Sequence, residues 1–245
     1  MLEVRKVSKA FRHNLVLREV GFRLEPGQCL GVAGHNGSGK TTLLSIIART
    51  LSADGGEILF DGVSLISDRA LAGDIIGYVP QENGLLEDLT VNETLAFWQK
   101  AYGLPAGSIY APSSPAVMLG LEEIRKKRIA RLSGGMQKRV SIAVALLRRP
   151  RLLLLDEALA ALDRGYRLAL ERYLDAFCRQ GGGVIYCSHD INELRSFCRR
   201  ILVLRDGSKV FDGDTELFPS DPAELDILLN PESRTSTISP EQVGR

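Results

Sequence analysis

The sequence lacks an apolar run long enough to cross a membrane as a helix. Its longest apolar runs fall well short of the ~20 residues that such a helix requires, and no charged segment followed by an apolar one opens the chain. Cysteines are also few, and the four present show neither metal-ligand spacing nor a disulfide framework. They are Cys29, Cys178, Cys187 and Cys198. We therefore expect a soluble cytosolic chain with reduced thiols.

An excess of charge of either sign is missing as well. The chain has 31 Lys and Arg against 30 Asp and Glu, a net charge of +1, so no overall field favours binding to nucleic acid. One basic run, 125–128, is more typical of a solvated face than of a ligand site. With 245 residues, the chain is long enough for one large α/β domain with an inserted lobe.

Strand-like runs occupy both ends of the sequence, and a helical pattern lies between them. The runs cover residues 2–7, 16–24, 29–33, 57–60, 63–65, 75–79, 151–156, 184–188, 201–204 and 209–211. Those near 152–155 and 184–187 are continuously apolar, as in parallel strands covered on both faces. We expect one domain over 1–230, with a helical subdomain inserted at about 82–149 and a mobile tail at 231–245, where Ser, Thr, Pro and Glu dominate.

The expected helical subdomain contains two local signals. Thr90-Val91-Asn92-Glu93 has the Thr-x-x-Glu form of a capping box, which marks the start of a helix. Leu95, Trp98 and Tyr102 then share one helical face. We interpret the only tryptophan as core packing, with a docking surface as the alternative.

A glycine-rich loop connects the buried run 29–33 to a helical pattern over 40–48. It fits the phosphate-loop pattern G-x-x-x-x-G-K-[ST], in which backbone N–H groups face the phosphates. Lys40 would add a positive charge and the Thr41 hydroxyl would be a ligand for Mg²⁺, whereas His35 holds a variable position and receives no catalytic role. The alternative is a glycine-rich turn that arose by chance. The candidate nucleotide-binding residues here are Gly34, His35, Asn36, Gly37, Ser38, Gly39, Lys40, Thr41 and Thr42.

Two acids follow the apolar run 152–155, at the end of a strand where doubly wound sheets place their ligands. Asp156 would hold Mg²⁺, directly or through water. Glu157, as a carboxylate, would be able to orient a water molecule and accept its proton. A solubilising pair of acids at a sheet edge is the alternative.

Two polar residues end other expected strands. Gln81 follows the run 75–79, and its neutral amide is able to bond both a cation and a water. His189 follows the run 184–188 and is a candidate functional residue, with a histidine at the edge of the core as the alternative.

A second glycine-rich loop, Leu132-Ser133-Gly134-Gly135-Met136-Gln137, lies at the start of a helical pattern. Its two glycines let backbone approach an anion, and the N–H groups and dipole at a helix start favour negative charge. This pattern indicates a second phosphate site. The alternative is a flexible connector that caps a helix beginning near Gln137.

Taken in order and spacing, these motifs resemble those of ATP-binding cassette (ABC) ATPases over about residues 1–215. Phe11 matches the position at which these ATPases have an aromatic residue that stacks on adenine. The alternative is that Phe11 packs among the first strands. The resemblance implies an α/β fold of the ABC type of P-loop NTPase. That fold has a mostly parallel core sheet, an N-terminal antiparallel β subdomain and an inserted helical subdomain.

The resemblance also implies roles in ATP hydrolysis. Two chains would pair head to tail, so that Ser133, Gly134 and Gly135 of one complete the ATP site of the other. Gln81 would bind Mg²⁺ and water, His189 would contact the γ-phosphate, and Asp163 would be the D-loop aspartate, unless it merely caps a helix. The stretch 158–161, Ala-Leu-Ala-Ala, departs from the Pro and Ser-Gly of many relatives and leaves the communication between the paired chains uncertain.

The leading functional hypothesis is the ATPase subunit of a membrane transporter, on the cytoplasmic face of the membrane beneath an integral-membrane permease. The passage 84–93 resembles stand-alone ATPases of bacterial ABC-2-type exporters, which favours export. Because every ATPase motif is present, a homodimer is the simpler assembly, with a heterodimer as the alternative. Other hypotheses are a soluble ABC ATPase for assembly of a complex such as the iron–sulfur cluster machinery, and a small-molecule kinase. The kinase leaves residues 133–135 without a role.

Overall fold

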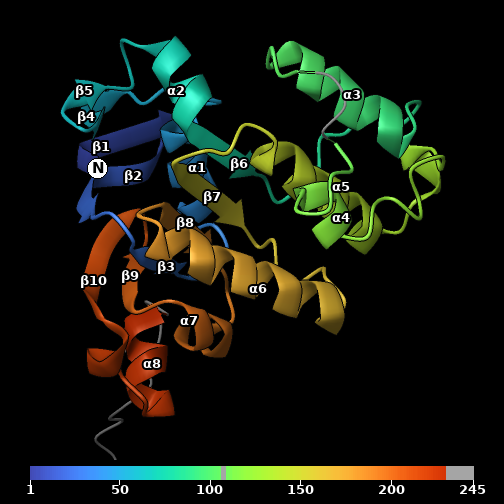
Figure 1. The fold of residues 1–245 in the computed structure, drawn as a ribbon. Coiled ribbons are helices and arrows are strands. Elements are labelled where there is room, and N and C mark those ends of the chain that lie inside the picture. The colour runs from blue at the N-terminus through green and yellow to red at the C-terminus, as the bar shows by residue number, and fades with distance from the viewer. Residues whose placement is uncertain (106–108, 230–245) are drawn as a thin grey trace, which may run out of the picture.

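The computed structural model describes residues 1–105 and 109–229, which form two sheets and a group of helices at one end (Figure 1). The first sheet is antiparallel and four-stranded, in the order β2-β1-β4-β5. Its strands are β1 (Leu2–Phe11), β2 (Asn14–Leu24), β4 (Gly55–Phe60) and β5 (Val63–Ser64). This arrangement is the expected N-terminal β subdomain.

The second sheet has six strands in the order β10-β9-β3-β8-β7-β6. Its strands are β3 (Cys29–Ala33), β6 (Ile76–Val79), β7 (Leu152–Asp156), β8 (Gly183–Cys187), β9 (Arg200–Arg205) and β10 (Ser208–Asp214). All neighbours pair in parallel except β10, which is antiparallel to β9. Because parallel strands end at the same edge, the segments that follow β3, β6, β7 and β8 lie along one edge of this sheet.

The helices of the structure divide between this sheet and a separate lobe. The α-helices are α1 (Lys40–Ile47), α2 (Arg69–Ile75), α3 (Val91–Ala101), α4 (Pro115–Met118), α5 (Gly134–Leu146), α6 (Arg164–Arg179), α7 (Ile191–Phe197) and α8 (Pro222–Leu229), with 3-10 turns η1 (Ile129–Arg131) and η2 (Thr215–Leu217). Figure 1 shows α3, α4 and α5 together at the end of the molecule away from the N-terminal strands. Among the described helices, none is both long enough and apolar enough to span a membrane.

Two hydrophobic cores lie on opposite faces of the six-stranded sheet. Alternate residues of β7 enter different cores: Leu153 and Leu155 pack with the helical lobe and with α6, whereas Leu152 and Leu154 pack with α1 and the N-terminal sheet. Side chains alternate across a strand, so one continuous run of leucine serves both cores. The apolar run in the sequence therefore reflects a strand that is covered on both sides.

The structure confirms the expected fold class and corrects several local expectations. The helical pattern expected from residue 82 begins only at Val91, because residues 82–90 form turns and irregular backbone up to the capping box of Thr90 and Glu93. Helix α2 was not expected, and Ile75, assigned to a strand, is its last residue. The tail expected at 231–245 lies outside the described residues.

Trp98 is half-buried, and its role is wider than the core packing that we expected. It packs against the core of the helical lobe, and its ring lies 5.3 Å from that of Tyr102. Both rings also line a groove of about 750 Å³ that reaches Gln81 and Thr41. The helical face that carries Leu95, Trp98 and Tyr102 therefore packs against the core and also lines a surface groove.

Candidate nucleotide site

The phosphate loop connects β3 to α1 through backbone that only glycine adopts readily. Gly34, Gly37 and Gly39 have φ values of 151°, 83° and 105°. A Cβ on Gly39 would lie 2.9 Å from the carbonyl oxygen of Val16, so this position excludes any side chain. The backbone conformation of the loop therefore requires glycine at these positions.

Lys40 lies inside this loop rather than in solvent. Its side chain is buried, and its ammonium donates hydrogen bonds to the carbonyls of Gly34, at 2.7 Å, and His35, at 3.0 Å. The imidazole of His35 lies between the carbonyl of Asn36, 2.7 Å from Nδ1, and Asp206, whose Oδ1 is 3.5 Å from Nε2. The ammonium of Lys40 therefore places a positive charge within the loop.

A cleft of about 420 Å³ opens beside the loop. Its lining comprises Phe11, Asn14, Val16, Asn36, Gly37, Gly39, Lys40, Thr41, Thr42, Gln81 and Glu157. Phe11 is 48% exposed, at the end of β1, with the Lys9 ammonium 5.5 Å from its ring centroid. An aromatic ring so exposed is not core packing, and its place on the cleft suits stacking against a flat base.

Glu157 is held by two of the other candidate residues. Nδ1 of His189 lies 3.0 Å from Oε1 of Glu157, and Nε2 of Gln81 donates to Oε2 at 3.4 Å. The backbone of Glu157 has a φ of 50°, a left-handed conformation that is costly for this residue type. Its N–H donates to the carbonyl of Cys187 on β8, which helps to hold that conformation. Two residues that follow other strands, Gln81 after β6 and His189 after β8, thus contact the carboxylate of Glu157.

Asp156 is nearly fully buried at the end of β7, and its Oδ2 has no hydrogen-bond partner. Burial raises the pKa of this carboxyl, while the hydrogen bond with the Thr41 side chain opposes that shift. A buried carboxylate oxygen without a donor is costly unless a cation satisfies it. The pair of Asp156 and Thr41, both oxygen donors, therefore fits a hard divalent cation such as Mg²⁺.

The second glycine-rich loop, 132–137, lies at the start of α5. Ser133 caps α5 by accepting a hydrogen bond from the N–H of Met136, so the helix begins at Gly134 and not near Gln137. Leu132 is buried, Ser133 and Gly134 are exposed, and the Gln137 amide donates to the carbonyl of Ile129. Within the described chain, the loop contributes no residue to the lining of the cleft beside the phosphate loop.

The model of the ABC transporter family matches residues 17–160, more than half of the chain. The chain belongs to the ABC transporter family. The linearmycin resistance ATP-binding protein LnrL of Bacillus subtilis is 34% identical over 87% of this chain and 69% of its own length. The Nod factor export ATP-binding protein I of Rhizobium etli is 31% identical over 96% of this chain and 79% of its own length.

Solved structures of ABC cassettes share the fold of the chain. The ATP-binding subunit of an ABC transporter superposes with a TM-score of 0.80 at 27% identity, covering 87% of this chain and 90% of that one. The dimeric, post-hydrolysis ATP-binding cassette MJ0796, bound to ADP and Pi, gives a TM-score of 0.76 at 27% identity over 89% and 100%. This ABC cassette is therefore an ATP-binding subunit and an ATPase, as the motifs predicted.

Residues 158–161, which we call the D-loop segment, lie against the second glycine-rich loop, 132–137, which we call the signature loop. The carbonyl oxygen of Ala161 would lie 2.5 Å from a Cβ on Gly135, whereas a Cβ on Gly134 would meet no heavy atom within 4 Å. Asp163 occupies the N-cap position of α6, but its exposed side chain makes no capping hydrogen bond. Asp163 therefore holds the helix-cap position that was the alternative, without the hydrogen bond that such a cap forms.

Sequence reasoning missed buried charges beside the ABC motifs, among them Lys138 and Glu193. Lys138, on α5, donates to the carbonyls of Pro80 and Gln81 at 2.8 Å each. Glu193, on α7, accepts from Ser188 at 2.6 Å and from Tyr186, and lies 3.1 Å from Nη1 of Arg167 on α6. The sequence shows that Lys138 and Glu193 are charged residues next to apolar positions of a helix. It does not show which residues they contact.

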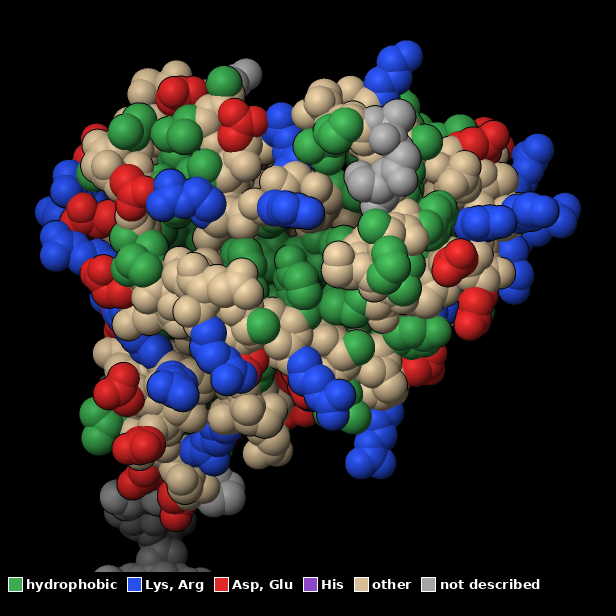
Figure 2. All heavy atoms as spheres, viewed as in Figure 1, with side chains coloured by type: hydrophobic (Ala, Val, Ile, Leu, Met, Phe, Trp, Pro, Cys, Tyr) green, Lys and Arg blue, Asp and Glu red, His purple; other side chains and the backbone are tan. Residues whose placement is uncertain are grey.

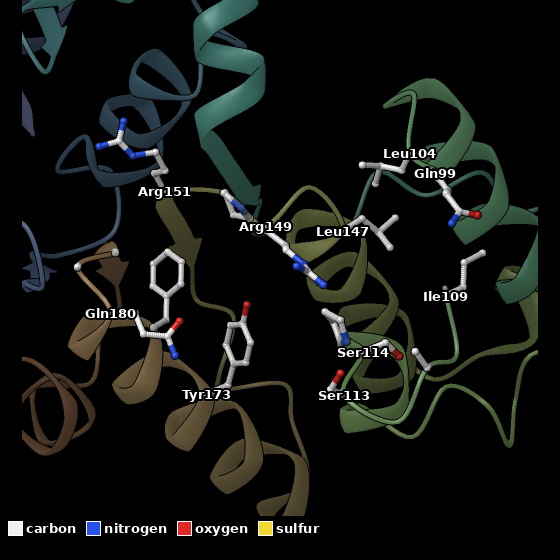
Figure 3. A pocket seen from close by; sticks show the side chains of 16 residues that line it. Gln99, Leu104, Ile109, Ser113, Ser114, Leu147, Arg149, Arg151, Tyr173 and Gln180 are labelled. Atoms are coloured by element: carbon white, nitrogen blue, oxygen red, sulfur yellow. The ribbon is translucent and has the colours of Figure 1, made fainter. Parts of the chain in front are cut away.

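A separate cavity of about 600 Å³ lies where the helical lobe of the ABC cassette meets its core (Figure 3). Tyr173 of α6 and Arg149 point into it from the core side, and Gln99 and Leu104 line it from the lobe. Figure 2 shows hydrophobic side chains gathered in the middle of this face, between scattered charges of both signs. None of the predicted site residues lines this cavity, so it is distinct from the nucleotide site.

Proposed function

We propose that this ABC ATPase powers a membrane exporter as a head-to-tail pair. The observation that carries the proposal is the position of the signature loop. Its Ser133 and Gly134 are exposed at the start of a capped helix, a favourable place for an anion, yet they lie outside the cleft of their own phosphate loop. A second chain would bring these donors to the phosphates of the bound ATP.

Within each site, Glu157 would act as the general base. Its carboxylate would accept a proton from the attacking water while Gln81 orients that water and His189 faces the γ-phosphate. The contacts of 3.0 and 3.4 Å that join these side chains support this assignment. Lys40 and the N–H groups of the phosphate loop would stabilise charge on the phosphates.

Magnesium would be held by Thr41 and Asp156, with Gln81 as a third oxygen donor. The orphaned Oδ2 of Asp156 supports this ligand set. When bound, the cation would neutralise charge on the phosphate oxygens during hydrolysis. ATP and Mg²⁺ are thus the proposed substrate and cofactor.

The groove beside Gln81 would receive the permease on the cytoplasmic face of the membrane. Its volume is about 750 Å³, and it extends from Thr41 to the rings of Trp98 and Tyr102. A helix or loop of the permease seated there would contact the Gln81 segment and the helical lobe together. Export is supported by the names of the relatives, which include an export ATP-binding protein and a resistance ATP-binding protein.

Pairing is testable with the Glu157→Gln variant. With the base removed and the shape kept, we expect ATP binding to persist, hydrolysis to be nearly abolished and an ATP-dependent dimer to accumulate. Size-exclusion chromatography with light scattering would measure the dimer, and Lys40→Ala in the same background is the control that should remain monomeric. A Glu157→Gln chain that hydrolyses ATP at the wild-type rate would rule out Glu157 as the base.

The transport role is testable by purification from membranes. Tagged chain should copurify from detergent extracts with a polytopic membrane protein that stimulates its ATPase activity after reconstitution in liposomes. A chain with the groove altered by Trp98→Ala should lose this partner while it keeps basal hydrolysis. Recovery of soluble partners alone would favour an ATPase for assembly of a soluble complex instead.

A further inference from the structure

Lys138 is a buried cation that joins two segments 57 residues apart in sequence. It is only 4% exposed, and its ammonium donates to the carbonyls of Pro80 and Gln81 at 2.8 Å each. A lysine that is removed from water in this way needs compensation by strong acceptors. Two carbonyls of one short segment supply it, so the ammonium fixes the backbone at the point where β6 leaves the sheet.

The two segments that Lys138 joins both bear on ATP hydrolysis. Lys138 lies on α5, whose first turn is the signature loop from Ser133. The side chain of Gln81 donates to Glu157, which in turn contacts His189. One ammonium therefore connects the helix that would meet the partner's ATP with the residue that would orient water at this chain's own ATP.

We propose that Lys138 is a positioning residue that sets Gln81 in register with the signature helix. Displacement of α5 would then move the Gln81 backbone, and with it the amide that faces Glu157. The inference rests on the proposed role of Gln81 in hydrolysis and adds to it a residue outside the recognised motifs. Within the described chain Lys138 forms no hydrogen bond or ion pair with Glu157, so we place its action through the backbone of Gln81.

The surroundings of Lys138 explain why a charge is kept there. Burial lowers the pKa of its ammonium, but the nearby carboxylates of Asp156 and Glu157 oppose this shift. The cation therefore lies within the field of the two acids, whereas an apolar side chain of similar length would fill the space and leave the carbonyls of Pro80 and Gln81 without a donor. Geometry and charge thus favour lysine over an isosteric hydrophobe.

A double-mutant cycle between Lys138 and Gln81 tests the proposal. Lys138→Met removes the donors and keeps the unbranched length, and Lys126→Met, on an exposed part of the same lobe, is the matched control. Each is made in the wild-type chain and in Gln81→Ala. The measurements are kcat and KM for Mg-ATP, the Kd of ATP in the absence of Mg²⁺, and the melting temperature.

We expect Lys138→Met to lower kcat about 10- to 100-fold, as a displaced active-site group does, with the Kd of ATP changed by less than about twofold. In the Gln81→Ala background the same substitution should change kcat by less than about twofold, because the amide side chain that Lys138 would position is then absent. Lys126→Met should leave all values unchanged. Lys138→Gln, which retains a shorter donor, should give an intermediate kcat and replaces Lys138→Met in the cycle if that chain does not fold.

Two results would overturn the inference. Equal losses of kcat from Lys138→Met in both backgrounds would show that Lys138 acts independently of Gln81, through stability or another contact. A wild-type kcat for Lys138→Met, while Gln81→Ala loses activity, would also refute it and would leave the proposed function intact. A wild-type kcat for Gln81→Ala would instead refute the proposed role of Gln81, and the inference would fail with it.

Discussion

Arg167 holds a buried carboxylate, so its removal should destabilise the chain by an amount that the structure allows us to estimate. The side chain of Glu193 is 3% exposed and lies 3.1 Å from Arg167, which is 34% exposed. Removing one partner of a buried ion pair costs about 3–5 kcal/mol. Because the hydroxyls of Tyr186 and Ser188 still donate to Glu193, we take the lower end, about 3 kcal/mol.

For a chain of this size, each kcal/mol lowers the melting temperature by about 2–4 °C, so Arg167→Met should lower it by about 6–12 °C. Circular dichroism would measure the change. Glu171→Gln removes only the second, more exposed partner of Arg167 and should cost less than about 0.5 kcal/mol. Adding Glu193→Gln to Arg167→Met should recover part of the loss, because no unpaired charge is then buried. A shift for Arg167→Met no larger than that of the Glu171 control would refute this reasoning.

Three further predictions follow from the geometry. Gly134→Ala should leave the melting temperature unchanged but impair ATP-dependent pairing and hydrolysis, whereas Gly135→Ala should lower the melting temperature as well; equal melting temperatures would contradict the contact with the D-loop. Asp156→Asn, or EDTA on the wild-type chain, should abolish hydrolysis while ATP binding, measured by equilibrium dialysis, persists; hydrolysis in EDTA would exclude the proposed metal. Hydrogen bonds from two arginines lower the pKa of Glu3 from 4.5 to about 2, so its contribution to stability should be present above pH 4.5 and disappear as the pH falls toward 2. The melting temperatures of the wild type and of Glu3→Gln, measured between pH 2 and pH 7, test this prediction. A difference between them that does not change with pH would contradict it.

The elements that the sequence predicted best are those whose cause is local. The strand Cys29–Ala33 has the expected bounds because a short apolar run is enclosed by a turn and by the glycine-rich loop. The four strand ends that carry the phosphate loop, Gln81, Glu157 and His189 were also expected, since parallel strands place their ends together. Motif and topology therefore located the candidate site.

What the sequence did not predict depends on contacts between distant segments. No spacing pairs Lys138 with a carbonyl 57 residues away, or Gly135 with the carbonyl of Ala161. Helix α2 has only seven residues, too few for a clear 3.6-residue period. Residues 82–90 were included in the expected helical subdomain, but the helix begins only at Val91, after its N-cap Thr90. Such features require the folded chain.

The alternation of leucines along β7 has a consequence for how the molecule can change. Leu153 and Leu155 belong to the core that includes the helical lobe, whereas Leu152 and Leu154 belong to the core around α1. Neighbouring positions of one strand therefore pack into different cores. We therefore expect a smaller side chain at 153 or 155 to perturb mainly the first core, and one at 152 or 154 mainly the second, which contains α1. Because the two cores share β7 but not its side chains, the packing of either face of the sheet is open to change by substitution at its own positions.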